Sequence, residues 1–339
     1  MNDVRTSQKL IGIMNVMNES REFKGPKPSI FIDGAEGTTA LEIRERLKDL
    51  IKSGKIKMVF VKGSAKNPEL RRKAMNKSDL VVLCLPDEAA KESVEIAGSL
   101  GVDAPRVLDA STAHRTARKW VYGFAEMDRN QPRKISEADA VSNPGCYATG
   151  AIALIRPLVK AGVIPEDQPL TINAVSGYSG GGKRMIKTYN EGTAPDFELY
   201  GLGLEHKHVP EIEKHSKLKR TPIFVPSVGN LYQGMLVSIP LHLEKLPTKP
   251  TGKDIAAVLE KYYAKSDQIK VVLHSSSETG RLDAQELAKT DKLELHVFWN
   301  ENKKQAVLVA SLDNLGKGAA GAAVQNIELM LGLTEKSDK

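Results

Sequence analysis

Short apolar runs alternate with helix-like segments along the first part of the chain. The runs have the length of buried strands, and the first is followed by apolar residues at helical spacing from Ala40 to Ile51. Alternation of this kind is typical of a doubly wound parallel sheet. We therefore predict a Rossmann-type α/β domain over residues 29–145. Its strands are expected at 29–32, 57–61, 80–85 and 106–108.

The pattern changes after residue 145. The apolar run 147–159 predicts a buried helix, and strand-like runs with few helices follow it. Residues 235–243 alternate between apolar and polar, as expected for a sheet with one covered face. This predicts an α+β catalytic and oligomerisation domain over 146–312, with a mixed or antiparallel sheet. Strands are expected at 171–175, 235–243, 269–273, 295–299 and 306–312, and a helix at 253–263.

The two ends of the chain differ from these domains. The apolar stretch 10–14 is short, no small-residue cleavage site follows it, and Glu19 and Glu22 argue against a transit peptide. We predict a flexible extension over residues 1–28. At the other end, the small residues of 313–322 run into apolar ones. They predict a C-terminal helix over 313–332 that packs back on the first domain.

Composition narrows the class of function. With 41% hydrophobic and 27% charged residues the chain is expected to be globular. No apolar run is long enough to span a membrane, so no membrane partner is expected. The net charge is +7, but the lysines are spread along the chain, which favours anionic small molecules over nucleic acid. Its two cysteines cannot form a disulfide scaffold, which suits the cytoplasm. Cys84, within an expected strand, is interpreted as a packed apolar residue.

A glycine turn follows the first expected strand. Gly34, Gly37 and Ala40 are three residues apart, where a dinucleotide-binding loop needs a tight turn and close packing of helix on strand. This is a variant of the usual glycine fingerprint, and an ordinary turn between strand and helix would also explain it.

The end of the second strand bears on the choice of cofactor. An acid there usually binds the ribose 2′-hydroxyl of NAD, but this chain has Lys62, Ser64 and Lys66. Their charge suits a 2′-phosphate and favours NADP, although surface lysines of a loop are an equal alternative. Pro86 closes an apolar strand, and the segment 111–115 supplies hydroxyls and a cation near the same sheet edge.

The sequence Asn143-Pro144-Gly145-Cys146 carries the strongest chemical signal. It places a thiol at the start of the predicted apolar helix. Backbone N–H groups and the peptide dipoles at a helix start favour thiolate, which is the nucleophile. The same N–H groups can hold an oxyanion if the sulfur attacks a carbonyl. The alternative is an unreactive core cysteine.

Three further segments of the second domain carry candidate chemistry. The glycine-rich segment 176–183 ends in Lys183 and suits a phosphate, although it lacks P-loop spacing and a flexible turn would also explain it. His206 and His208 are expected on one side of an extended segment, with Pro210 starting a helix. One of them can serve as base for a thiol, and no further ligands complete a metal site. Asn314 and Lys317 lie where they could reach a cofactor or anion.

Taken together, residues 29–332 resemble the shorter form of the N-acetyl-γ-glutamyl-phosphate reductase family of arginine biosynthesis. The most specific pair is SNPGCY and HKHVPE, and the extension and the lysine-rich strand end are departures. The resemblance implies a fold like those of semialdehyde and glyceraldehyde-phosphate dehydrogenases. It is carried, in order, by IDGAEGTTALEIRERL, LCLPD, DASTAHR, WVYGFAE, SNPGCYATG, SGYSGGGK, HKHVPE and DNLGKGAAGAAVQ.

The resemblance also implies a reaction and roles for residues. Cys146 attacks the acyl phosphate and forms a thioester, and NADPH reduces it to the semialdehyde. His208 is assigned the acid and base role, with His206 as the second choice. Cofactor binding is assigned to Gly34, Gly37, Thr38, Thr39, Lys62, Ser64, Pro86, Ser179, Gly180 and Asn314. Substrate binding is assigned to Ser111, His114, Arg115, Asn143 and Lys183, and no metal is assigned.

Some alternatives stay open at this point. A related reductase of aspartyl phosphate or of a carrier-protein-bound lysine precursor would have the same fold and nucleophile. A non-catalytic redox sensor that binds NADP, or a nucleic-acid binder, explains fewer residues. A homodimer and a homotetramer are both compatible with the exposed sheet expected in the second domain.

Overall fold

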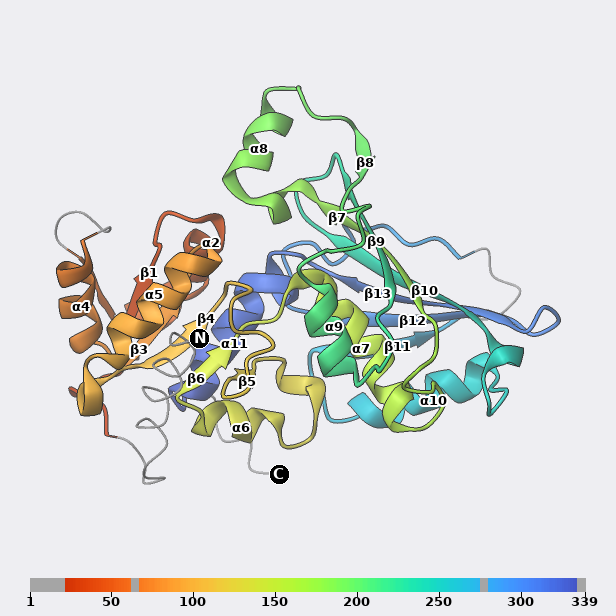
Figure 1. Cartoon of the computed structure of the whole chain (residues 1–339), viewed down its shortest axis with the longest axis horizontal. Helices are drawn as coiled ribbons and strands as arrows, with labels where there is room; N and C mark the ends of the chain where they lie inside the picture. The colour runs from red at the N-terminus through yellow and green to blue at the C-terminus, as the bar shows by residue number, and fades with distance from the viewer. Residues whose placement is uncertain (1–21, 62–66, 275–279, 334–339) are drawn as a thin grey trace, which may run out of the picture. The chain divides into compact units, whose positions relative to one another are not determined.

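The structure is a computed structural model that describes residues 22–61, 67–274 and 280–333 (Figure 1). It divides into two compact units. The first contains the chain up to Pro144 together with the chain from Ala322 onward, and the second is Gly145–Gly321. Among the described residues, no helix is both long and apolar enough to cross a membrane.

The first unit contains a six-stranded parallel sheet. Its strands β1 and β3 are buried along their whole length, as expected when helices cover both faces of a sheet. The four predicted strands are confirmed, whereas β5 and β6 were missed because two or three residues carry no periodic signal. The strand order is β2 (Lys57–Val59), β1 (Ser29–Asp33), β3 (Leu80–Leu83), β4 (Arg106–Asp109), β6 (Ala140–Ser142) and β5 (Val121–Tyr122).

A buried ion pair joins the first strand to two helices of this unit. Arg71 Nη2 lies 3.0 Å from Asp33 Oδ2, and the Ser93 hydroxyl donates to the same oxygen at 2.5 Å. Both charged side chains are nearly inaccessible to water, so each satisfies the other. The helices are α2 (Thr38–Arg46), α3 (Lys48–Lys52), α4 (Pro68–Asn76), α5 (Asp87–Gly98), α6 (Gln131–Glu137) and α11 (Gly321–Met330), which begins at the last residue of the second unit.

The second unit contains a seven-stranded sheet with parallel and antiparallel pairs, which confirms the predicted mixed sheet. In β10 one face is buried and the other is partly open, in register with the predicted alternation. The order is β11 (Ile269–Leu273), β12 (Leu293–Asn300), β13 (Gln305–Leu312), β10 (Met235–His242), β7 (Thr171–Gly177), β9 (Ile223–Gly229) and β8 (Phe197–Leu199).

The helix α7 (Cys146–Lys160) forms the core of the second unit. Every residue from Tyr147 to Val159 is buried, which confirms the predicted apolar helix. It packs against α9 (Val209–Ser216), α10 (Gly252–Tyr263) and the strands β10 and β13 (Figure 1). The approach is close at Gly150, where a Cβ would lie 2.9 Å from Val237 Cγ2. The close packing of α7 therefore fixes the position of its first residue, Cys146.

The loop predicted over 176–183 has regular structure instead, and the C-terminal α-helix predicted over 313–332 begins later, at Gly321. The segment 176–183 ends β7, makes a 3₁₀ turn over Tyr178–Gly181 and then begins α8 (Gly182–Asn190). The segment after Asp313 forms a π-helical turn over Gly316–Ala320 before α11 starts. In the predicted extension, residues 1–21 lie outside the described part of the chain. Lys24 N–H donates to Asp79 Oδ1 at 2.7 Å.

Candidate active site

Cys146 is the first residue of α7, and its side chain is half-buried. Gly145 caps the helix with an extended backbone and provides no capping side chain. The first intrahelical bond runs from Thr149 N–H to the Gly145 carbonyl at 2.8 Å. The N–H groups of residues 146–148 thus precede the helical ladder and point toward the helix start. This is the arrangement that favours a thiolate and its oxyanion products.

A buried carboxylate connects this helix start to the histidine segment. Glu211 Oε2 accepts the Gly145 N–H at 3.1 Å, and Glu211 Oε1 lies 3.9 Å from His208 Nε2. Glu211 is 1% exposed and His208 is 6% exposed. The carboxylate therefore accepts a hydrogen bond from the turn that precedes the cysteine. It also lies beside the imidazole of His208, which is three residues before Glu211 in the chain. Sequence reasoning missed Glu211, although its spacing from His208 was a usable signal.

The two histidines meet through a turn and not through the predicted extended segment. His208 has helical backbone angles, and Val209 N–H donates to the His206 carbonyl at 2.9 Å. His206 Nδ1 accepts the His208 N–H at 3.1 Å, and the two rings lie edge to face at 4.8 Å between centroids. The prediction of an extended backbone was wrong, because the helix that contains Pro210 begins at Val209.

Two tyrosines, the buried Tyr147 and the half-buried Tyr200, form a hydrogen-bonded pair beside the cysteine. Tyr200 donates its hydroxyl to the Tyr147 hydroxyl at 3.0 Å, and Tyr147 donates to the Ser227 carbonyl at 2.9 Å. Burial raises the pKa of Tyr200 to about 12, and the charge of Cys146 adds to the rise. Burial also raises the pKa of Tyr147, with Tyr200 and then Cys146 adding to it. Both hydroxyls thus lie within electrostatic range of Cys146. Nothing local in the sequence indicated Tyr200.

A glycine allows the close approach of another segment to Cys146. A Cβ on Gly318 would lie 2.8 Å from Cys146 Cβ and 2.9 Å from the Asp313 carbonyl oxygen. Only glycine is compatible with this separation. The glycine and alanine content of 313–322 therefore serves in part to place a backbone turn against the cysteine.

In the first unit, the glycine turn is a tight connection between β1 and α2. Gly34 has φ +84°, and a Cβ there would lie 2.3 Å from the Cys84 carbonyl oxygen. Gly37 N–H donates to the Gly34 carbonyl at 3.1 Å, and Gly37 caps α2 without a side-chain partner. Thr38 and Thr39 are half-buried in the first turn of α2. A bare helix start beside a glycine turn suits a phosphate.

The carboxyl end of β4 carries a closed polar network. The buried Asp109 accepts the Ser111 N–H and hydroxyl, each at 2.8 Å, and lies 2.6 Å from His114 Nδ1. The His114 ring stacks on Trp120 with centroids 4.1 Å apart. Ser111 and His114 are therefore oriented by one carboxylate at the edge where open α/β sheets bind ligands.

Two other predicted substrate residues are tied into the same edge. Arg115 is 8% exposed, and its Nε donates to the Asn143 carbonyl at 2.9 Å. Asn143 is 2% exposed, and its Oδ1 accepts from Asn326 Nδ2 at 3.0 Å. These contacts support the backbone of the segment that leads into Cys146. Pro86, one residue before α5, caps that helix at the end of the β3 connection.

The remaining predicted residues of the second unit fall into two groups. Asn314 Nδ2 donates to the Ser179 hydroxyl at 2.9 Å, and its Oδ1 accepts the Gly234 N–H at 2.8 Å. A Cβ on the neighbouring Gly180 would lie 3.4 Å from Asn314 Nδ2. Lys183 differs, because it is exposed on α8 and belongs to a helix, not to the predicted loop. Asn314 thus fastens a turn, whereas Lys183 remains accessible to a ligand.

Lys62 and Ser64 lie outside the described residues. Within the described ranges, no group of three or more histidine, cysteine, aspartate or glutamate residues is arranged to hold a metal ion.

Matches to protein families define the class of this chain. The model of the semialdehyde dehydrogenase NAD-binding domain matches residues 30–135, and that of the semialdehyde dehydrogenase dimerisation domain matches residues 146–314. The chain belongs to the semialdehyde dehydrogenase family, and it is an oxidoreductase with a nicotinamide-cofactor domain and a dimerisation domain. Membership of this enzyme family contradicts the alternative of a non-catalytic sensor.

Curated relatives narrow the resemblance within that class. Proteins of Brucella ovis, Brucella canis and Brucella abortus named N-acetyl-gamma-glutamyl-phosphate reductase are each 49% identical to this chain. Each alignment covers 90% of this chain and 99% of the relative. The resemblance seen in the sequence motifs is thereby confirmed.

Solved structures with the same fold are more distant in sequence. Aspartate semialdehyde dehydrogenase II of Vibrio cholerae has a TM-score of 0.64 at 15% identity and covers 90% of this chain and 99% of its own. The enzyme of Francisella tularensis has a TM-score of 0.66 at 12% identity, with 88% and 98% covered. The enzyme of Candida albicans, solved with NADP, has a TM-score of 0.62 at 13% identity, with 90% and 98% covered. These likenesses confirm the fold.

Proposed function

We propose that this chain reduces N-acetyl-γ-glutamyl phosphate to N-acetyl-L-glutamate 5-semialdehyde and phosphate, with NADPH, in arginine biosynthesis. The observation that carries the proposal is the thiol of Cys146 at the start of the buried helix α7, with Glu211 connecting that start to His208. The name of the Brucella relatives supports the substrate, since each aligns along nearly its whole length.

The first chemical step belongs to Cys146. Its thiolate attacks the carbonyl carbon of the acyl phosphate, a C–S bond forms, and the C–O bond to phosphate breaks to leave a thioester. The N–H groups at the start of α7 stabilise the oxyanion of the tetrahedral intermediate. Each such donor contributes about 3–4 kcal/mol in comparable sites. The rigid support of α7 holds them in place while the carbonyl carbon changes geometry.

His208 handles the protons in this proposal. Its imidazole takes the thiol proton before attack and returns a proton when the C–S bond of the thiohemiacetal breaks and the aldehyde leaves. Proton transfer of this kind contributes a factor of about 10² to 10⁴. Glu211 acts as a positioning residue, because its carboxylate lies beside His208 Nε2 and is fixed by the Gly145 N–H. His206 supports the backbone of His208 through its ring nitrogen.

The cofactor is assigned to the first unit. Gly34, Gly37, Thr38 and Thr39 would hold its phosphates, and the tight turn at Gly34 fits that role because it leaves no room for a side chain. When bound, the nicotinamide supplies the hydride that reduces the thioester. Pro86 would line the same edge, and Ser179, Gly180 and Asn314 of the second unit are also assigned to cofactor binding. The proposal specifies NADP over NAD.

Substrate contacts are assigned to Ser111, His114 and Lys183. Asp109 orients the first two, and Lys183 presents an exposed cation suited to a phosphate or carboxylate. Arg115 and Asn143 are buried and hydrogen-bonded, so they position the segment before Cys146. The matched dimerisation domain supports a homodimer, and the need for a reduced thiol supports a cytoplasmic location.

The reverse reaction provides the test. N-acetylglutamate semialdehyde, phosphate and NADP⁺ are mixed with the enzyme, and NADPH is followed by its absorbance. We expect phosphate-dependent formation of NADPH. Aspartate semialdehyde should be turned over at least about a hundredfold less efficiently, because it is one methylene shorter and has a free ammonium group in place of the acetamide. A preference for aspartate semialdehyde would contradict the proposed substrate.

A further inference from the structure

We propose that Arg44 and Phe60 form the part of the first unit that recognises the adenosine 2′-phosphate of the cofactor. This inference rests on the proposed function, which requires NADPH, and it identifies the residue that sets the preference for NADPH over NADH. All of the residues involved belong to the first unit.

The first observation is a cavity beside the glycine turn. It has a volume of about 130 Å³ and lies where β1 and β2 end and α2 begins. Gly34 and Ala35 form one side, and Val59, Phe60 and Val61 form another. In doubly wound sheets the adenosine half of a dinucleotide lies at these strand ends, with its pyrophosphate on the glycine turn. The cavity is therefore where the ribose that carries a 2′-phosphate is expected.

The second observation is the position of Arg44 at this cavity. Arg44 lies in α2, and its guanidinium carbon is 5.7 Å from the centroid of the Phe60 ring. Phe60 directly follows β2 and is 64% exposed, which is unusual for a phenylalanine. An exposed ring next to a cation offers an adenine one face for stacking and a phosphate one guanidinium.

The third observation concerns the charges around Arg44. Among the described residues, no carboxylate lies within ion-pair distance of its guanidinium, and its neighbour Glu45 is instead paired with Lys48 at 2.5 Å. The sequence from Lys57 to Pro68 contains no acid that could accept a ribose 2′-hydroxyl. An arginine of α2 that has no carboxylate partner in the described part of the chain, and that faces the end of a strand without an acid, suits a phosphate and not a hydroxyl.

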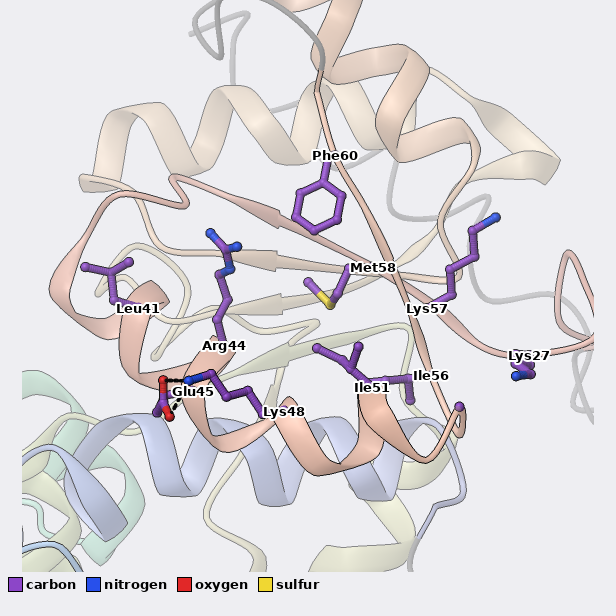
Figure 2. Close-up of a pocket in the computed structure, with 11 residues that line it drawn as sticks. Lys27, Leu41, Arg44, Glu45, Lys48, Ile51, Ile56, Lys57, Met58 and Phe60 are labelled. Atoms are coloured by element: carbon purple, nitrogen blue, oxygen red, sulfur yellow. Dashed lines mark hydrogen bonds and ion pairs between the residues drawn. The ribbon is translucent and has the colours of Figure 1, made fainter.

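Arg44, Met58 and Phe60 also border a larger groove of about 670 Å³ (Figure 2). Lys27, Lys48 and Lys57 line that groove, and Figure 2 shows Lys57 and Lys27 at the end away from Leu41. These lysines line the groove but not the cavity at the glycine turn. The lysines raise the positive potential of the groove, whereas Arg44 lines both the groove and the cavity. This difference supplies a matched control.

The test compares two fragments that differ only in the phosphate. Binding of adenosine 2′,5′-bisphosphate and of AMP is measured by calorimetry on the full chain, without substrate. We expect Arg44→Gln to weaken the bisphosphate about tenfold to hundredfold, as for loss of one charge-assisted contact, and AMP less than about threefold. The ratio of kcat/KM for NADPH to that for NADH should fall by the same factor.

Lys48→Gln is the control, because it removes the same charge from the next helix, α3, at a position that lines the groove but not the cavity. We expect it to change both affinities less than about threefold. Phe60→Ala should weaken both fragments alike, since stacking acts on the adenine. The thermal unfolding midpoint of each variant confirms that it is folded.

Three results would overturn the inference. Equal losses for the bisphosphate and AMP in Arg44→Gln would assign Arg44 to the adenine alone. An unchanged bisphosphate affinity would place recognition of the 2′-phosphate elsewhere. Equal effects of Arg44→Gln and Lys48→Gln would mean that any nearby positive charge favours the bisphosphate, without a specific contact from Arg44. A wild-type chain that does not prefer the bisphosphate to AMP would instead contradict the choice of NADP in the proposed function.

Discussion

The two cysteines of this chain follow strands of the same parallel sheet but have opposite surroundings. Cys84 follows β3 in the first unit, and Cys146 comes shortly after β6 and opens α7 of the second unit. Both side chains are half-buried, so exposure does not distinguish them. Burial of the sulfur raises the pKa of Cys84 to about 12, and Asp109 and Asp33 add to the rise. Burial of the sulfur, and then the charges of two carboxylates, therefore keep the Cys84 thiol protonated.

Cys84 has a structural role that explains its position. Its N–H donates to the Asp33 carbonyl at 2.8 Å and extends the ladder between β1 and β3. Its own carbonyl occupies the space next to Gly34. Cys146 instead begins a helix, where the first backbone N–H groups and the peptide dipoles favour a thiolate. The comparison teaches that the same residue type is held protonated within the sheet but lies, at a helix start, where the backbone favours a thiolate.

The largest expected effect comes from substituting each of the two cysteines in a separate variant. Cys146→Ser should lower kcat by at least about 10⁴-fold, because the nucleophile is lost while binding is kept. Cys84→Ala should leave kcat within about threefold of the wild type. Both rates are measured in the reverse assay, with NADP⁺ binding as a control for folding. Comparable activity of the Cys146 and Cys84 variants would exclude the covalent mechanism.

The next effect separates the acid–base group from the residues that position it. His208→Asn should lower kcat about 10²- to 10⁴-fold, and Glu211→Gln should lower it by a smaller factor while shifting the pH profile of kcat/KM. His206→Asn should have the smallest effect of the three, since its ring nitrogen accepts a backbone N–H. A larger loss for His206→Asn than for His208→Asn would reverse the assignment.

A matched pair of glycine substitutions tests the close contact between the glycine turn and the Cys84 carbonyl group. Gly34→Ala should destabilise the chain by about 2 kcal/mol or more, because φ is +84° and the new Cβ would lie 2.3 Å from the Cys84 carbonyl oxygen. Gly37→Ala should cost less than about 1 kcal/mol, because its nearest neighbour would be 3.5 Å away. Urea unfolding midpoints measure both, and equal costs would show that the turn relaxes.

The smallest effect, counted per pH unit, is a loss of stability at alkaline pH that concerns Cys84 itself. Its pKa rises from 9.0 to about 12 on folding, so the folded chain keeps a proton that the unfolded chain releases between those values. Stability should therefore fall as the pH rises from 9 toward 12, by at most about 1.4 kcal/mol per pH unit from this group. Cys84→Ala should make the slope of the unfolding free energy shallower in that window. An unchanged slope would mean that the thiol is not buried in solution.

Much of the fold follows from patterns along the chain, and the exceptions have physical reasons. The strands β1, β3 and β10 and the helix α7 are long or apolar enough to be predicted. The strand β9 was missed because Pro226 lies within it, and proline normally indicates an edge or a break. It is tolerated because the three-residue β8 pairs only with residues after Pro226, and the Pro226 carbonyl still accepts the Tyr200 N–H at 3.2 Å.

What the sequence determined by itself is the identity and order of the reactive groups: a cysteine at a helix start, a histidine pair before a proline, and a glycine turn after the first strand. These are local features, set by residues a few positions apart. The tertiary structure alone decided that Glu211 joins the cysteine helix to His208, that Tyr200 lies beside Tyr147, and that Arg44 reaches Phe60. Such partners are far apart in the chain or on different elements, and no local periodicity encodes which side chains packing brings together.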